Sequence, residues 1–418
     1  MSVLQDSYEI ISYMLINKKT FNKSLNAFFT TNVRNDDELK KFIKVYILFF
    51  KKYYYFEALT KELLTKATPS LITYIGITLI NVRLLNVDID EAIEFIKNAL
   101  KKNKEKYSDE IEKAIIDFKN KKEYPLNNIK KGSVESLSVF FNLPLWFIKM
   151  TLAQHGLEKS KLIFESFKNK KYVQYFLKSK LVDLDSVDEE LNKKFTLDTK
   201  TNLYLTSESD NELIKNKTYV KTSSFYEEIF KNDLKLINKY ITLYQNEDSN
   251  FFYRFLNQYL YLNNVINFAV DSFYNVKDAI TVVAQKRIND LFVYESTPNE
   301  LISHLSFKQD AIFYAAKSTY FEEFYFKPEY RVLFDTELID KFIKEQKSSL
   351  KEISSYVENG GRLIYLVETI DIKETSKVIS AFLSENNDFI LEKEEFIIPN
   401  EENSSFGYYA ILKRENHA

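Results

Sequence analysis

The sequence predicts an α+β protein of several domains: an all-helical N-terminal part, a small α/β subdomain and a C-terminal open α/β sheet. Three observations support this class. Apolar residues recur at helical spacing through residues 1–125. From residue 236 onwards, short apolar runs alternate with helical segments, as in a mostly parallel sheet. Near the C-terminus a helical pattern leads into Gly360-Gly361 and an apolar run over residues 362–367.

The composition excludes several kinds of site. The chain has 418 residues, enough for more than one domain, with no cysteine and three histidines. Disulfides, thiolate metal ligands and cysteine nucleophiles are therefore absent, and a histidine-built metal centre is not expected. No run of 18 apolar residues occurs, and the first residues do not form a secretory signal. We expect a cytoplasmic protein with no membrane segment and no metal.

Positive charge is concentrated in the N-terminal part. Residues 1–131 contain 23 Lys and Arg against 17 Asp and Glu, and the remaining residues contain 35 against 43. This asymmetry fits a polyanion contacted from the N-terminal side. A solvated lysine-rich helical surface explains it equally well.

The N-terminal part is expected to be a bundle of about five or six helices. One of these helices begins at Pro69 and contains Gly76. A glycine inside a helix costs about 1 kcal/mol relative to alanine, so we expect another helix to pack closely against it.

Two basic clusters in this part are candidate RNA-binding sites. Lys51-Lys52 precede the aromatic residues 53–56, and Lys18-Lys19 form the second cluster with Lys23. Lysines can contact phosphates, and aromatic rings can stack on bases. The favoured alternative is that the rings pack inside the bundle while the lysines face solvent, because these positions continue a helical apolar pattern.

Between the bundle and the sheet we expect a linker and a small subdomain. Residues 120–133 are polar and basic, and a helix is expected to open at Pro144 and close at Gly156. Trp146 is interpreted as a packing anchor, and His155 as a helix-end residue. Short strands are expected near residues 172–177, 195–197 and 202–205. The predicted domain boundaries are 1–130, 131–235 and 236–418.

The C-terminal sheet is predicted from short apolar runs. The expected strands are Tyr240–Tyr244, Val265–Val270, Asp290–Tyr294, Ala311–Tyr314, Arg362–Val367, Phe389–Leu391 and Tyr408–Leu412. The helix before Gly360-Gly361 should begin near Asp335-Thr336, and the glycine pair should cap its C-terminus. Ligands of such sheets bind at the carboxyl ends of the strands.

A glycine-rich nucleotide loop is missing from the sequence. No glycine occurs between Gly156 and Gly360, and the segment after the first strand, Gln245–Phe252, contains two acids. This is unsuited to cradling a phosphate or a nucleotide cofactor. Asp271 directly follows a predicted strand and could accept hydrogen bonds from a ribose, although a helix N-cap is an equally good explanation.

The order of these segments resembles the bacterial small-subunit rRNA cytosine-C5 methyltransferases with a NusB-like N-terminal domain (Sun/Fmu type). The matching segments are Glu358–Tyr365, Val378–Leu383, Phe406–Lys413, Leu143–Ile148 with Gly156, Lys327–Glu329, the helix that holds Gln346 and, more loosely, residues 1–125. The resemblance implies a NusB-like bundle, a Rossmann-like methyltransferase sheet, S-adenosyl-L-methionine as cofactor and rRNA as partner.

The chain departs from this family where the family performs its chemistry. The glycine-rich cofactor loop corresponds to Gln245–Phe252, and the second cysteine position is occupied by Ser318. The nucleophilic cysteine position is occupied by Glu368, and only the ribose-binding acid has a counterpart, Asp271. Cytosine-C5 methylation needs a thiolate that adds to the ring. The resemblance therefore implies a catalytically inactive relative that binds RNA, with S-adenosyl-L-methionine not bound.

Two other functions stay open on the sequence alone. One is an active RNA methyltransferase with a divergent site. The other is a protein-interaction module, in which the bundle contacts the transcription or ribosome-assembly machinery and the sheet serves as a scaffold.

Overall fold

A computed structural model describes residues 3–21, 23–24, 36–168, 174–178, 196–198, 203–206, 219–222, 240–245, 290–294, 308–319, 321, 323–399 and 406–415. The chain forms two compact units. One consists of residues 1–156 with 323–335, and the other of residues 157–322 with 336–418. The three-domain division stays a prediction.

The first unit is a helical bundle. Its helices are α1 (Val3–Asn17), α3 (Asp36–Lys51), α4 (Tyr53–Leu63), α5 (Pro69–Leu84), α6 (Ile89–Lys102), α7 (Asp109–Lys119) and α8 (Val134–Phe141), followed by the first part of α9 (Leu145–Lys168). Helix α5 is buried almost all round and forms the centre of the bundle. It begins as the sequence indicates, with Pro69 in its first turn and Thr68 as N-cap, whose hydroxyl accepts a hydrogen bond from the Leu71 amide.

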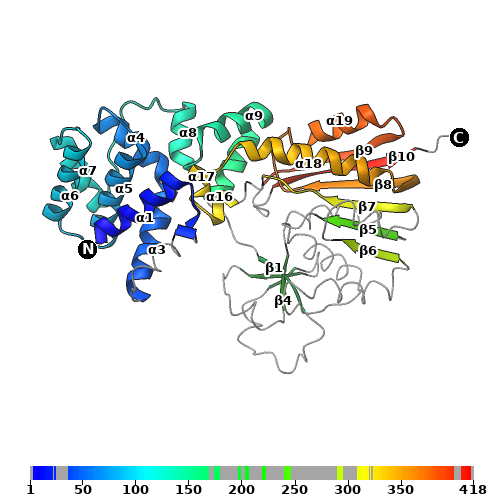
Figure 1. Cartoon of the computed structure of the whole chain (residues 1–418), viewed down its shortest axis with the longest axis horizontal. Coiled ribbons are helices and arrows are strands. Elements are labelled where there is room, and N and C mark those ends of the chain that lie inside the picture. The colour runs from blue at the N-terminus through cyan, green and yellow to red at the C-terminus, as the bar shows by residue number, and fades with distance from the viewer. Residues whose placement is uncertain are drawn as a thin grey trace, which may run out of the picture. The chain divides into compact units, whose positions relative to one another are not determined.

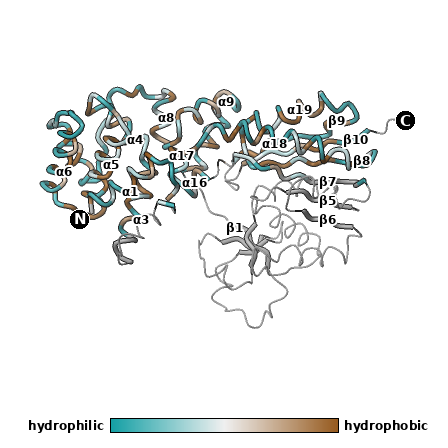
Figure 2. The backbone as a smooth tube through the Cα atoms, viewed as in Figure 1, coloured by the Kyte–Doolittle hydropathy of each residue, from teal (hydrophilic) through white to brown (hydrophobic). Residues whose placement is uncertain are grey.

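Gly76 allows the central helix to pack tightly. An alanine Cβ at this position would lie 2.7 Å from the Phe49 ring and 2.9 Å from the Phe56 ring. The expected close packing is therefore present, and aromatic side chains of α3 and α4 supply it. The other helices are amphipathic, and Figure 2 shows both hydrophilic and hydrophobic colours along the tube of α6.

A distant segment completes the first unit. Residues 323–335, with α16 (Glu323–Phe326) and α17 (Tyr330–Leu333), belong to the bundle unit although they lie far along the chain. The Phe21 amide and the Tyr46 hydroxyl donate hydrogen bonds to the Glu329 carboxylate. The buried Arg331 donates from Nε to the Phe324 carbonyl at 2.7 Å and from Nη1 to the Asn142 carbonyl at 3.1 Å.

The second unit contains a six-stranded sheet in the order β6-β5-β7-β8-β10-β9. The strands are β5 (Tyr240–Gln245), β6 (Asp290–Tyr294), β7 (Gln309–Ala315), β8 (Val357–Val367), β9 (Phe389–Ile397) and β10 (Gly407–Arg414). The first four are parallel, and β10 runs antiparallel to both of its neighbours. The predicted mostly parallel sheet with a closing hairpin is confirmed. The expected strand Val265–Val270 lies outside the described residues.

Two helices cover one face of this sheet. They are α18 (Glu337–Ser354), which begins where the sequence predicts, and α19 (Ser376–Glu385). Apolar side chains of both helices pack with those of the central strands in one buried cluster. Tyr314, Tyr365 and Tyr408 are fully buried in it, on neighbouring strands.

The expected role of Gly360-Gly361 as a helix cap is wrong. Helix α18 already ends at Ser354, and the glycine pair lies inside β8. Gln309 and Ala311 of β7 pair with Val357 and Arg362 of β8, respectively. Strand β8 therefore has more residues than β7 between these two pairs, and the extra residues form a bulge. Gly360 has a φ of 79°, which glycine adopts without strain.

The remaining described strands form a four-stranded antiparallel sheet. Its order is β2-β3-β1-β4, with β1 (Gln174–Lys178), β2 (Thr196–Asp198), β3 (Leu203–Thr206) and β4 (Tyr219–Thr222). The bounds of β1, β2 and β3 match those of the predicted short strands within two residues. Gly156, with a φ of 72°, interrupts α9, so the first part of this helix ends where the sequence indicates.

Within the described part of the chain, no single helix is long and apolar enough to cross a membrane. Taken together, helices α8 and α9 have the length and apolar composition of a membrane span, but they form a bent pair.

Candidate functional site

The carboxyl ends of β7 and β8 bring two key positions together. The strands are parallel neighbours, with Ala315 opposite Leu366. Beyond these ends, the Ser318 hydroxyl donates a hydrogen bond of 3.3 Å to the Glu368 carbonyl oxygen. Both side chains are half-buried. The two positions that the resemblance aligns with the family's cysteines therefore lie next to each other at one edge of the sheet.

A buried carboxyl group lies beside this pair. The Thr319 amide donates to Glu374 Oε1 at 3.1 Å, and the Thr319 hydroxyl lies 2.5 Å from Oε2. The Thr369 hydroxyl lies 3.4 Å from the same Oε2 and 3.1 Å from the Thr319 hydroxyl. We call these three residues the Glu374 network. It joins the segment after β7 to the segment after β8.

Burial controls the protonation of this carboxyl. Glu374 is fully buried, and desolvation raises its pKa from 4.5 to about 7. The negative charge of Asp371 on the same segment adds to the rise, whereas hydrogen bonds from Thr319 and Gln346 oppose it. Near neutral pH the group therefore exchanges between its ionised and neutral forms.

The two hydroxyl groups allow the network to be satisfied in both forms. With Glu374 ionised, the Thr319 hydroxyl donates to Oε2. With Glu374 protonated, Oε2 donates to the Thr319 oxygen, and the Thr319 hydroxyl turns to the Thr369 oxygen, 3.1 Å away. Each hydroxyl can reverse direction because it is both a donor and an acceptor.

Helix α18 and strand β8 hold Glu374 in place. Gln346 Nε2 donates to the Lys317 carbonyl at 2.8 Å and to Glu374 Oε1 at 3.4 Å. The Tyr365 hydroxyl donates to the Glu374 carbonyl at 2.7 Å. Gln346 is fully buried, and its Oε1 has no hydrogen-bond partner among the described residues. Gln346 thus helps to hold the carboxyl group of Glu374, and Tyr365 holds its backbone.

The Glu374 network has a structural role and not a catalytic one. A hydroxyl beside a carboxyl with a raised pKa has the form of a nucleophile and its base. However, Thr319 is only 7% exposed and Glu374 is 0% exposed, so a substrate has no access to either. The network therefore ties two loops together at the edge where substrates of such sheets bind.

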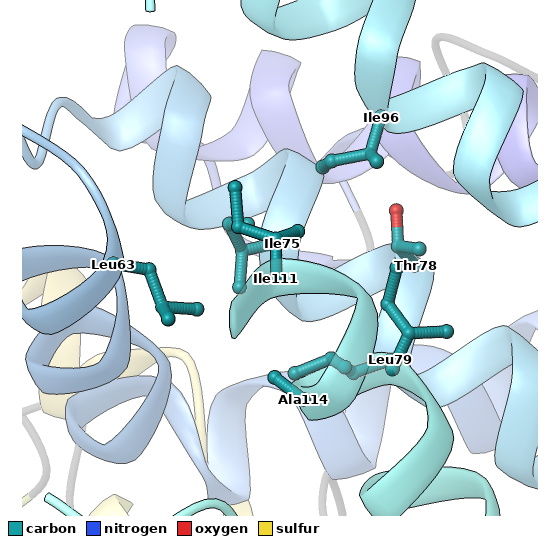
Figure 3. Close-up of a pocket in the computed structure, with 8 residues that line it drawn as sticks. Leu63, Ile75, Thr78, Leu79, Ile96, Ile111 and Ala114 are labelled. Atoms are coloured by element: carbon teal, nitrogen blue, oxygen red, sulfur yellow. The ribbon is translucent and has the colours of Figure 1, made fainter. Parts of the chain in front are cut away.

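A hollow in the bundle offers no ligand site (Figure 3). It is lined by Leu63, Ile75, Thr78, Leu79, Ile96, Ile111, Ala114 and Ile115 and is too small for a water molecule. The Thr78 hydroxyl is already bonded to the Tyr74 carbonyl. Among the described residues, no group of three or more His, Asp or Glu side chains could hold a metal ion.

The predicted RNA-binding lysines lie at helix ends of the first unit. Lys18 and Lys19 are exposed just beyond α1, and Lys51 is exposed at the end of α3. Lys52 is half-buried and forms an ion pair with Glu123. Their role in RNA binding stays a prediction.

The aromatic residues that follow these lysines belong to the bundle core. Tyr53, Tyr55 and Phe56 are buried and contact other aromatic rings of the bundle. Stacking of these rings on bases is therefore excluded for the folded bundle, and the packing interpretation of the stretch is confirmed.

The predicted cofactor-binding region cannot be placed. Asp271 and residues 246–252 lie outside the described residues. Of the predicted loop, only Gln245 is described, as the last residue of β5.

Sequence reasoning did not single out Thr319 and Glu374. Their pairing spans 55 residues, and each lies in an irregular segment without periodicity. Gln346 could be recognised from the sequence, because it is a polar residue on the same face of a predicted helix as the apolar Phe342 and Ile353.

The fold of this chain is shared with the solved structure of PH0851. The structure of PH0851 has a TM-score of 0.60 and 15% sequence identity, with 99% of each chain covered. A methyltransferase homologue from Pyrococcus horikoshii has a TM-score of 0.47 and 15% identity over 68% of this chain and 100% of that one. NSun6 from Pyrococcus horikoshii has a TM-score of 0.41 and 12% identity, over 64% and 97%. No family model and no curated protein matches the sequence.

Proposed function

We propose that this protein binds RNA, with rRNA as its target, and that it does not methylate cytosine. The observation that supports this most strongly is the pair Ser318 and Glu368. These residues occupy adjacent positions at the carboxyl ends of β7 and β8, where the resembling family carries its two cysteines. The chain contains no cysteine that could replace them.

Without a thiolate, the chain lacks the nucleophile that cytosine-C5 methylation requires. Addition to C6 of cytosine requires a soft, strongly nucleophilic group, and C5 becomes reactive only after that addition. The Glu368 carboxylate is a poor nucleophile towards the ring. The Ser318 hydroxyl donates to the Glu368 carbonyl oxygen, which is too weakly basic to take its proton.

The cofactor is proposed to be lost as well. S-adenosyl-L-methionine in the resembling family is held by a glycine-rich loop, and the corresponding segment here, Gln245–Phe252, has no glycine and carries Glu247 and Asp248. Asp271 alone would leave the methionine part of the cofactor without a binding site.

RNA binding is proposed from the positive charge of residues 1–131 and from the family resemblance. The setting we propose is ribosome assembly in the cytoplasm. Titration calorimetry with S-adenosyl-L-methionine and filter binding of rRNA over a salt series test the proposal. We expect no heat of binding for the cofactor, and RNA affinity that falls steeply with salt.

Other results would favour the two other functions. Cofactor binding together with methyl transfer would indicate an active methyltransferase with a divergent site. Absence of RNA binding at low salt would leave a protein-interaction module in transcription or ribosome assembly as the better explanation.

A further inference from the structure

We propose that the turn between α6 and α7 is the surface on which this protein holds the phosphate backbone of RNA. The inference rests on the proposed RNA-binding function and assigns it to a surface that the sequence analysis did not select. Five lysines define this surface, which we call the α6–α7 lysine patch: Lys97, Lys101, Lys102, Lys104 and Lys106.

The lysines of the patch are exposed and form no ion pairs with the described residues. All five lysines are exposed. None of them forms an ion pair with any residue that the structure describes. Elsewhere in the same unit, Lys52 pairs with Glu123 and Lys61 pairs with Glu57. Unpaired like charges at this density repel each other, and a polyanion relieves the repulsion.

The one acid within the patch points into the protein. Glu105 is 9% exposed, and the Thr65 amide and hydroxyl donate to its carboxylate at 3.1 Å and 2.6 Å. The carboxylate is therefore committed to the α4–α5 connection. A lysine-rich sequence that merely keeps a helix soluble does not require its single acid to be bound away from the surface.

Helix stability explains only part of the patch. Lys101 and Lys102 lie in the last turn of α6, where cations interact favourably with the helix dipole. Lys104 and Lys106 lie beyond the helix, and Lys104 has a φ of 59°. They extend the positive charge past the helix end, where the dipole no longer accounts for it.

The patch is suited to phosphates and not to bases. The aromatic ring of Tyr107, in the same turn, is covered by Lys97 Nζ at 4.6 Å from the ring centre. Its hydroxyl donates to Glu112 at 3.3 Å. A ring occupied in this way is not open for base stacking, so binding at the patch should not depend on RNA sequence.

Two acidic residues follow the α6–α7 lysine patch in sequence and limit its positive surface on one side. Asp109 and Glu110 occupy the first turn of α7, where they complement the positive end of its dipole. In Figure 1, α6 and α7 lie on the side of the bundle away from α16 and α17. The patch therefore does not involve the segment that completes the first unit.

Removal of three charges tests the inference. The variant Lys101→Gln/Lys104→Gln/Lys106→Gln keeps the long side chains and neutralises them. The matched control is Lys341→Gln/Lys344→Gln/Lys347→Gln, which removes three exposed lysines of α18. Filter binding of a single-stranded RNA and of a duplex RNA is measured at salt concentrations from about 50 to about 300 mM.

We expect the patch variant to bind both RNAs about 10-fold or more weakly at 0.1 M salt, with the salt slope reduced by about 2. The control should bind like the wild type. The charge-preserving variant Lys101→Arg/Lys104→Arg/Lys106→Arg should retain affinity, which would assign the loss to charge. An unchanged thermal unfolding midpoint of the Gln variant excludes misfolding as the cause.

Three results would overturn the inference. Wild-type affinity in the patch variant would show that RNA binds elsewhere, and the proposed function would stand. Absence of RNA binding by the wild type would remove both proposals. If the patch variant lost only its binding to phosphatidylserine vesicles while its RNA affinity was unchanged, the patch would be a lipid surface.

Discussion

The Thr319 hydroxyl oxygen lies 2.5 Å from a carboxylate oxygen of Glu374, although 55 residues separate the two in sequence. This contact joins the loops that follow β7 and β8, at the edge of the sheet where ligands of open α/β sheets bind. Ser318 and Glu368, the immediate neighbours of the network, are the residues that the sequence resemblance aligns with the family's two cysteines. The edge is thus held by buried hydrogen bonds and has no thiol.

Replacement of Glu374 should change the pH dependence of stability. Its pKa is raised to about 7 in the folded chain, so between about pH 4.5 and 7 the folded state binds a proton that the unfolded state lacks. The free energy of unfolding should therefore fall by about 3 kcal/mol as the pH rises through this interval. In Glu374→Gln this decrease should disappear.

Urea unfolding at pH 5 and pH 8 measures that difference. Glu358→Gln, which removes an exposed acid of β8, is the control and should keep the wild-type dependence. An identical pH dependence in Glu374→Gln and wild type would show that Glu374 does not titrate in this range.

Loss of the Thr319 hydroxyl should destabilise the second unit. Thr319→Val leaves Glu374 Oε2 with only the Thr369 hydroxyl at 3.4 Å. The expected loss is about 1–3 kcal/mol, as for a buried polar group deprived of its partner. Thr319→Ser retains the hydroxyl and should lose less, so the two variants compared by denaturant unfolding isolate the hydrogen bond. Because valine keeps the volume of threonine, unchanged stability in Thr319→Val would contradict a contribution from the hydrogen bond.

Arg331 should be a strong determinant of the first unit. The side chain is buried and donates to the carbonyls of Phe324 and Asn142. Arg331→Ala leaves these groups without their donor, and we expect a loss of roughly 2–4 kcal/mol. Lys327→Ala removes an exposed partner of Glu323 and should cost below about 1 kcal/mol. Comparable midpoints of thermal unfolding for the two variants would contradict this ranking.

Gly76→Ala should destabilise the bundle despite the better helix propensity of alanine. The gain in propensity is about 1 kcal/mol, whereas overpacking costs about 1–3 kcal/mol. The new Cβ would lie 2.7 Å from the Phe49 ring. In a Phe49→Leu background the same substitution should be less harmful, and a double-mutant cycle measures the coupling. No coupling would mean that the ring is not the obstacle.

The sequence predicted those elements that have a regular pattern. The closing strands, the start of α18 near Thr336 and the bundle around Gly76 follow from periodicity and from Pro and Gly positions. The glycine pair was misassigned, because a pair of glycines after a helical pattern is typical of a cap. Its actual place in a β8 bulge depends on pairing with β7.

The candidate site was only partly predictable. The resemblance pointed to Ser318 and Glu368, and the structure brings them together. Glu374 could not be found in this way, because its partners Thr319 and Gln346 lie 55 and 28 residues away. Burial raises its pKa, and burial is a property of the folded sheet that no local pattern encodes.

Methyl transfer tests the central claim most directly. The purified protein is incubated with small-subunit rRNA and S-adenosyl-L-methionine labelled in its methyl group, and label in the RNA is counted after the complex is captured on a filter. We predict that the RNA is retained by the protein and that it acquires no label. Label recovered as 5-methylcytosine would contradict the account, because it would require a cytosine-activating nucleophile in a chain without cysteine.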